Sequence, residues 1–268
     1  MIRIADVLLN PKRAKRHSIE LILIAFVYTS LSMFLGYWIF PEYSSLFSIF
    51  FSVISCVYVV QGILIVEEKR ERDFDDEFII LKKHMRTLKF LIVLFFGFLL
   101  AYVFWTIVLP ERIGVEIFSI QKTEIENIRS ITGSAINPDN FTIILYNNFR
   151  VLVFSLILAL FYGAGSIFIL VWNASIMGFV IGTLARNVVG LASLPQVFLK
   201  YFIHGLPEMI AYFIVALVGG ILFIEIIKGD FVKGKVKRTF IDIFFLLIIA
   251  IFLLVLAALL ETYVSPLI

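Results

Sequence analysis

The sequence predicts an all-α, polytopic membrane protein with about seven transmembrane helices. Of its 268 residues, 61% are hydrophobic and 16% are charged, whereas soluble domains carry about 25% charged residues. The mean hydropathy is +1.03. The apolar residues gather in long runs, and a run of about 20 such residues is long enough to cross the hydrocarbon core of a bilayer as a helix. These observations exclude an ordinary soluble fold.

Seven apolar runs predict the membrane spans. The fifth run, 174–191, is the shortest and could instead form a re-entrant or interfacial segment. The first run follows the basic stretch PKRAKRHS without a small-residue cleavage pattern, so we expect it to remain as a span. The predicted spans are 19–40, 46–66, 90–109, 141–171, 174–191, 202–227 and 240–260.

The positions of lysine and arginine predict the orientation. Basic residues concentrate in the N-terminal segment 1–18, in the charged loop 67–89 and in the loop 229–239. If there are seven spans and the N-terminus is cytoplasmic, all three segments lie on the cytoplasmic side of the membrane. Basic residues are enriched on that side in membrane proteins. Six spans would break this pattern at the last loop. We therefore expect a multi-pass protein of the cell membrane, in contact with the lipid bilayer, and no nucleic-acid partner.

The polar segment 110–139 is predicted to form an extracytoplasmic amphipathic helix. Its isoleucines recur at helical spacing, with charged residues between them. We expect it to lie either on the outer membrane surface or against another part of the protein. The predicted organisation is a basic cytoplasmic N-terminus (1–18), a three-helix membrane segment (19–109) with a charged cytoplasmic loop (67–89), the amphipathic segment (110–139), a polar membrane core (140–228), a basic cytoplasmic loop (229–239), and a last transmembrane helix with its tail (240–268).

Polar residues inside the apolar runs concentrate in the fourth, fifth and sixth spans. We therefore interpret these spans as a packed functional core and the other four as a lipid-facing jacket. Amide side chains in such positions hydrogen-bond between helices, although an asparagine near the interface needs no such partner. The predicted intramembrane polar core consists of Asn147, Asn148, Arg150, Asn173, His204 and Glu208.

Small residues in the same three spans favour close packing or a hinge. Gly178 and Gly182 form a Gly-x-x-x-Gly pair, which lets helix backbones approach in lipid. Pro207 removes a backbone donor and can free the carbonyl of residue 203. With Gly205 beside it, we expect a helix that starts late, kinks or begins as a broken half-helix. The predicted packing or hinge residues are Gly163, Gly165, Gly178, Gly182, Gly205, Pro207, Gly219 and Gly220.

His204 and Glu208 are the most informative pair, because ionisable groups inside a span are costly. Four residues apart, they share one helical face. Three interpretations stay open: a structural device with Glu208 neutral or paired to Arg150 or an asparagine of the fourth span, a carrier of protons or cations in transport, and a metal site for hydrolysis. The last is the weakest, because a catalytic zinc needs three protein ligands and the other histidines, His17 and His84, are predicted to be cytoplasmic.

Motifs of common enzymes are absent from the sequence. It has no His-Glu-x-x-His motif, no P-loop and no serine with an obvious base. We therefore expect no enzymatic activity, no metal and no cofactor.

The stretches LYNNFRVLVFSLILALFYGAGSIFILVWNASIMGFVIG and FIHGLPEMIAYFIVALVGGILF resemble the membrane core of the stage II sporulation protein M family. The shared pattern is an Asn-Asn pair, a glycine-containing middle, an asparagine opening the next helix, and His-Gly-x-x-Glu. The resemblance covers about residues 140–227, and Ala174 stands where the family usually has glycine. The residues that fall on the pattern are Asn147, Asn148, Gly163, Asn173, Gly182, His204, Gly205 and Glu208.

This resemblance implies a non-enzymatic membrane protein. The founding member is similar to a scaffold that recruits two peptidoglycan-degrading enzymes during engulfment of the forespore. Relatives occur in bacteria and archaea that never sporulate, so a general role in membrane organisation transfers better than the sporulation role. We expect a scaffold or assembly protein, as a homodimer, that binds membrane or extracytoplasmic partners. The alternative is a transporter or channel component that uses Glu208 for proton or cation coupling.

Overall fold

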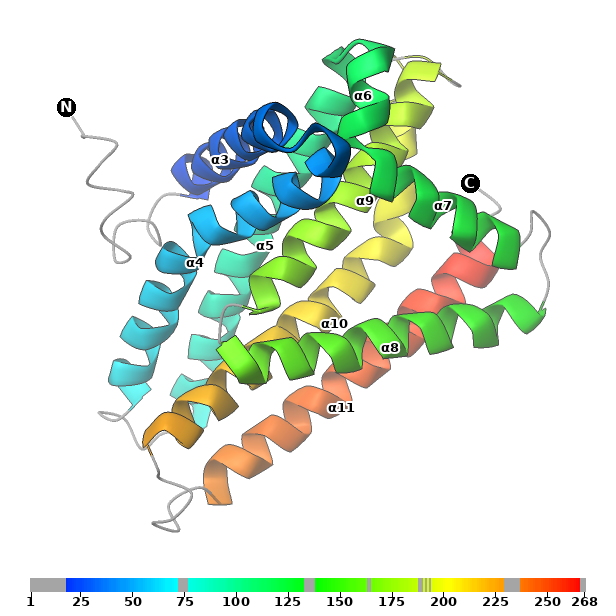
Figure 1. The fold of residues 1–268 in the computed structure, drawn as a ribbon. Helices are drawn as coiled ribbons and strands as arrows, with labels where there is room; N and C mark the ends of the chain where they lie inside the picture. Colours follow the sequence, from blue (N-terminus) through cyan, green and yellow to red (C-terminus); the bar gives the residue numbers. More distant parts are fainter. Residues whose placement is uncertain are drawn as a thin grey trace.

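A computed structural model describes residues 18–71, 77–132, 138–162, 165–187, 190, 192, 194–228 and 237–265, and every regular element in these ranges is helical (Figure 1). The predicted all-α fold is confirmed. The long helices are α3 (Ser18–Ile39), α4 (Ser44–Glu71), α5 (Glu77–Val108), α8 (Pro138–Tyr162), α9 (Gly165–Asn187), α10 (Leu194–Lys228) and α11 (Lys237–Leu259). The short ones are η1 (Pro41–Tyr43), α6 (Glu111–Ile117), α7 (Ser119–Thr132) and η4 (Leu260–Val264).

Some predicted features lie outside the described residues. They are the N-terminal segment 1–17, residues 72–76 of the charged loop, residues 133–137, Gly163 and residues 229–236 of the basic loop.

Within the described ranges, six helices are long and apolar enough to cross a membrane. The apolar stretch Pro41–Val57, which covers η1 and the first half of α4, is shorter. The prediction of about seven apolar helices agrees with this set, and the chain is a multi-pass membrane protein. The candidate spans are Ile19–Ile39, Leu88–Val108, Asn140–Ala159, Ile167–Arg186, Leu194–Phe223 and Thr239–Val264.

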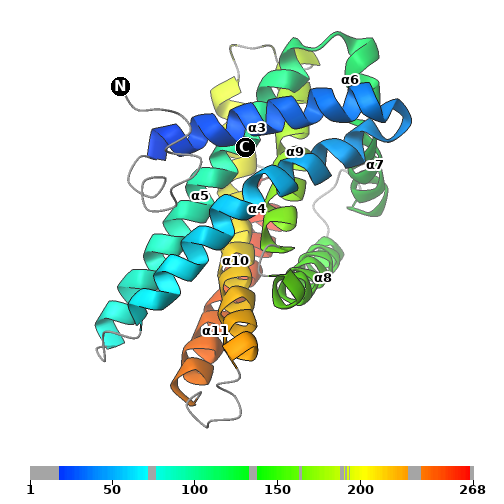
Figure 2. The same cartoon turned by 60° about the vertical axis from the view of Figure 1, so that its left-hand side comes forward.

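Helices α5, α9 and α10 form the centre of the bundle (Figures 1 and 2). Helices α3 and α4 pack together on one side of it, and α8 and α11 pack against α10 on the other. The span in α10 is 61% buried and that in α5 is 56% buried, but the span in α8 is only 22% buried. The predicted division into a core and a jacket is therefore wrong for two helices: α5 is central and α8 is peripheral.

Close contact between α5 and its neighbours explains this position. A Cβ added at Gly178 of α9 would stand 2.5 Å from the Cβ of Tyr102, and one at Gly182 would stand 2.6 Å from the Cβ of Thr106. On the other side of α5, a Cβ at Gly97 would meet the Cβ of Ala25 in α3 at 2.5 Å. The glycines let α5 pack closely between α3 and α9, so that Phe95, Phe98 and Tyr102 are buried rather than lipid-facing.

The fourth predicted span ends earlier than the sequence suggested. The apolar run continues to 171, but α8 ends at Tyr162 and α9 begins at Gly165. Hydropathy alone cannot mark this boundary, because apolar residues continue through it and only the glycines interrupt the helical preference. The correction moves Arg150 from near the start of the predicted span to the middle of α8. It also lengthens the next helix, α9, enough to cross the membrane.

Helix α10 is continuous for 35 residues and contains Pro207 in its interior. The predicted broken half-helix, beginning near residue 202, is therefore wrong: the helix starts at Leu194 and runs through the proline. Proline is tolerated inside membrane helices because the surrounding structure can compensate the lost backbone bond. Two residues before the proline, a Cβ added at Gly205 would meet the Cε atom of Met177 in α9 at 2.5 Å.

The amphipathic segment folds back on the bundle as two short helices, α6 and α7. Gln121 in α7 is buried, accepts a hydrogen bond from Ser45 of α4 at 2.6 Å and donates one to Ser175 of α9 at 3.0 Å. Of the two expected positions, the segment therefore takes the one against the protein. Arg186 of α9 donates to the carbonyl of Leu109 at 2.6 Å, which satisfies an otherwise unpaired acceptor at the end of α5.

Candidate functional site

A row of polar side chains follows one face of α10. His204, Glu208 and Tyr212 are four residues apart, so they lie on the same side of the helix. The Tyr212 hydroxyl donates to Oε1 of Glu208 at 2.8 Å. Nδ1 of His204 lies 2.7 Å from the Ser265 hydroxyl, near the end of the chain. These ionisable groups are therefore hydrogen-bonded within the protein, as intramembrane polar groups require.

Tyr212 also connects α10 to α8. Its hydroxyl lies 3.4 Å from the backbone carbonyl of Asn148, a longer contact than the one to Glu208. A phenol has one hydrogen to donate, so the shorter contact takes it most of the time. The predicted pairing of Glu208 with Arg150 is wrong, because Glu208 is bonded to Tyr212 and Arg150 points outward.

Asn148 is the residue of α8 that faces this site. It is 5% exposed, and its side-chain nitrogen has no hydrogen-bond partner among the described residues. A buried amide without a partner costs free energy, all the more where water is excluded. The site therefore includes one unused donor besides its satisfied groups.

The end of the chain completes the site. Residues Leu260–Val264 form a π-helical turn, a rare geometry that often occurs at functional positions. This turn, which contains Glu261, packs against α10. Ser265 follows directly and contacts His204. The C-terminal turn thus joins the polar face of α10 through Ser265.

Sequence reasoning missed Tyr212, Glu261 and Ser265. Two signals were available. Tyr212 continues the four-residue spacing of the His204–Glu208 pair, and Glu261 is an isolated acid at the end of an apolar run. That Ser265 meets His204 depends on how α11 packs against α10, which spacing along the chain does not reveal.

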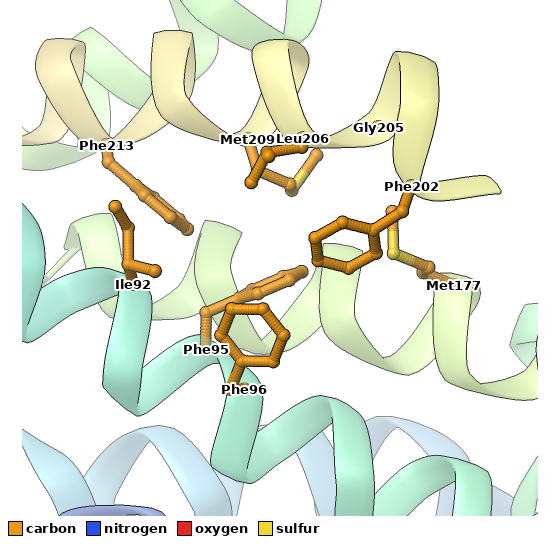
Figure 3. A pocket seen from close by; sticks show the side chains of 9 residues that line it. All are labelled: Ile92, Phe95, Phe96, Met177, Phe202, Gly205, Leu206, Met209 and Phe213. Atoms are coloured by element: carbon orange, nitrogen blue, oxygen red, sulfur yellow. The ribbon is translucent and has the colours of Figure 1, made fainter. Parts of the chain in front are cut away.

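The opposite face of α10 is apolar. There, α10 forms a narrow crevice with α5 and α9 (Figure 3). The residues that line it are all apolar and include Phe95, Met177, Phe202 and Met209. The crevice has no room for a water molecule. It provides no hydrated route along this side of the helix.

The remaining predicted polar residues lie apart from this site. Asn173 donates its side-chain N–H to the carbonyl of Ile169, within its own helix, at 2.8 Å. Asn147 and Arg150 are exposed on the outer side of α8. The six predicted polar residues therefore do not form one core: only Asn148, His204 and Glu208 come together.

The predicted packing residues take various positions. A Cβ added at Gly219 of α10 would collide with Ala159 of α8, so these two helices touch at that point. Gly220 is buried beside it, and Gly165 is the first residue of α9. Across the described residues, no group of three or more His, Cys, Asp and Glu side chains is close enough to hold a metal ion.

Arg150 occupies an unusual place for a charged residue. It stands twelve residues from each end of the helix Pro138–Tyr162, and its guanidinium lies 5.8 Å from the ring centroid of Tyr146. An arginine at the middle of a membrane helix costs about 2.5 to 3.5 kcal/mol on insertion scales. A cation–π contact at an exposed position returns only about 0.5 to 1 kcal/mol.

The helices and their intramembrane polar groups define an integral, multi-pass membrane protein. The sequence matches the family model of Stage II sporulation protein M over residues 26–266, nearly the whole chain, and the protein belongs to this family. The match extends well beyond the resemblance seen at 140–227 and includes the C-terminal turn. No curated protein and no solved structure shows significant similarity to the chain.

Proposed function

We propose that this protein is a non-enzymatic scaffold of the cell membrane that organises partner proteins. The observation that supports this proposal is the use of its intramembrane polar groups. Glu208 accepts a hydrogen bond from Tyr212, and His204 contacts Ser265. Groups used in this way fix how α8, α10 and the C-terminal turn pack against one another. A scaffold needs such a fixed arrangement to present its surfaces.

The extracytoplasmic helices α6 and α7 offer one such surface. Gln121 ties α7 to α4 and α9 through two buried hydrogen bonds. The outward side of the pair carries exposed charges of both signs, including Glu111, Arg112, Lys122 and Glu126. A charged surface held rigidly in place suits the binding of an extracytoplasmic protein.

The homodimer was expected because several helix faces are rich in glycine. In the structure, Gly178 and Gly182 face α5, Gly205 faces Met177, and Gly219 faces Ala159. These glycines pack inside one chain and offer no surface to a second copy.

The alternative function, transport coupled to Glu208, defines the experiment. The purified protein and a Glu208→Gln variant are reconstituted into liposomes, and proton, sodium and potassium fluxes are followed under imposed gradients. We expect both proteins to match empty liposomes. A flux in the wild type that disappears in Glu208→Gln would overturn the scaffold proposal.

A second experiment tests the scaffold directly. A photo-crosslinking amino acid replaces Lys122 on α7 or, as a matched control, Phe252 on the lipid-facing side of α11, where it is 66% exposed. In cells, we expect discrete protein adducts from position 122 and only lipid adducts from position 252. Equal adduct patterns at the two positions would contradict a partner surface on α7.

A further inference from the structure

Helix α8 has two faces of different character. Asn148, Leu152, Ser155 and Ala159 are buried against the bundle. Arg150 is two residues from both Asn148 and Leu152, which places it about 200° around the helix axis from each of them. It therefore points directly away from the protein, and Figure 2 shows α8 at the edge of the bundle.

The outward faces of two other peripheral spans provide the comparison. The exposed residues of α3 from Ile19 to Ile39 are all apolar, and so are those of α11 from Phe240 to Leu259. Lipid is a sufficient neighbour for such faces. On α8, the exposed side chains between Thr142 and Ile157 are also mostly apolar or aromatic, but Asn147 and Arg150 stand among them.

Lipid offers Arg150 no counter-charge, and among the described residues its guanidinium meets no carboxylate. Its position twelve residues from each end corresponds to about 18 Å along the axis, farther than its side chain reaches towards a headgroup when the helix crosses the membrane. Within the described residues its recorded contact is with the ring of Tyr146. Charges in the membrane interior pair with one another or face a protein interior.

We propose that the outward face of α8 binds a transmembrane helix of a partner protein that carries an aspartate or glutamate near the middle of its span. The partner carboxylate pairs with the guanidinium of Arg150, and the Asn147 amide supplies a further hydrogen bond. The aromatic and aliphatic side chains around them pack against the partner helix. This proposal names a class of partner for the scaffold proposed above and rests on that function.

A second copy of this chain fits the face less well. A two-fold symmetric contact places the same residue of each copy near the axis, so two α8 helices packed through this face would bring two Arg150 charges together. The chain also lacks a matching acid at that depth on an outward face in the described spans. Glu208 accepts a hydrogen bond from Tyr212, and Glu261 lies in the C-terminal turn that packs against α10.

The test uses the full-length protein in liposomes, labelled with a donor fluorophore, and synthetic acceptor-labelled transmembrane peptides of leucine and alanine. Three peptides differ only at the central residue, which is Glu, Leu or Lys. Energy transfer reports association. We expect the Glu peptide to associate about tenfold more strongly than the Leu peptide, as one intramembrane polar pair implies.

Two variants make the result specific. Arg150→Leu should remove the preference for the Glu peptide, and Arg150→Glu should shift the preference to the Lys peptide. Lys122→Leu, which removes an exposed charge outside the spans, should behave like the wild type. The proposal is overturned by equal binding of the Glu and Leu peptides, by a preference that survives Arg150→Leu, or by self-association of the labelled protein that occupies this face and excludes the peptides.

These outcomes are separable from the test of the scaffold function. A Glu208-dependent flux together with Glu-peptide binding would remove the scaffold proposal and leave the docking surface in place. An absence of flux with equal binding of all peptides would leave the scaffold proposal in place and remove the docking surface.

Discussion

Helices α8 and α10 each carry an ionisable residue within a membrane span, but the two residues meet different surroundings. Glu208 of α10 accepts a hydrogen bond from Tyr212 and lies near α8 and the C-terminal turn. Arg150 of α8 is exposed and points away from the bundle. The difference teaches that an intramembrane charge is not in itself a sign of transport. A charged group that is hydrogen-bonded within the chain, like Glu208, stabilises the packing of that chain. A charged group that is exposed at mid-span, like Arg150, marks a surface for a partner protein.

The largest expected effect concerns the contact that holds α8 to α10. A Gly219→Val variant places a branched side chain against the backbone of Ala159, and overpacking of this kind costs about 1 to 3 kcal/mol. Reversible unfolding in bilayers measures the loss. Gly114→Ala in α6 is the control, because an added Cβ meets nothing within 4 Å there. Equal stability of the two variants would show that α8 does not depend on this contact.

A smaller effect is expected from Tyr212→Phe. The substitution leaves a partly buried Glu208 oxygen without its donor, at a cost of about 1 to 2 kcal/mol in the free energy of unfolding. Adding Glu208→Leu removes both partners, so the double variant should lose less than the sum of the single variants. Strict additivity in this double-mutant cycle would mean that the two side chains do not interact.

The smallest loss is expected from Ser265→Ala. It removes the contact with His204, and interhelical hydrogen bonds in membranes contribute about 0.6 kcal/mol on average. Ser55→Ala is a suitable control, since the Ser55 hydroxyl bonds only to the carbonyl of Phe51 in its own helix. If both variants unfold identically, the C-terminal turn is not held to α10 by this bond.

The sequence predicted the helical class, the approximate spans and the special character of the His204–Glu208 pair. Each of these depends on local composition or on spacing within one helix. Three errors share another cause. The central position of α5, the end of α8 at Tyr162 and the outward direction of Arg150 all depend on which helix packs against which. The polar and small residues of the fourth span suggested a central position for α8, and the bulky apolar residues of the third span suggested a lipid-facing position for α5. Composition treats a buried phenylalanine and a lipid-facing one alike, so both assignments were wrong.

The site was predictable to the same extent. Spacing placed His204 and Glu208 on one face, and the concentration of polar residues in the fourth to sixth spans included Asn148 in the predicted core. Glu261 and Ser265 lie more than 50 residues further along the chain and reach the site only because η4 packs against α10. No periodic pattern carries that information.

The most direct test of the account compares the free energies of unfolding of Arg150→Leu and Tyr212→Phe, measured side by side in the same bilayers. We predict that Arg150→Leu loses no more than about 0.5 to 1 kcal/mol, the contribution of its exposed cation–π contact with Tyr146, while Tyr212→Phe loses about 1 to 2 kcal/mol. A loss for Arg150→Leu as large as that for Tyr212→Phe would contradict it, because Arg150 would then belong to the packing of the chain and not to a surface for a partner.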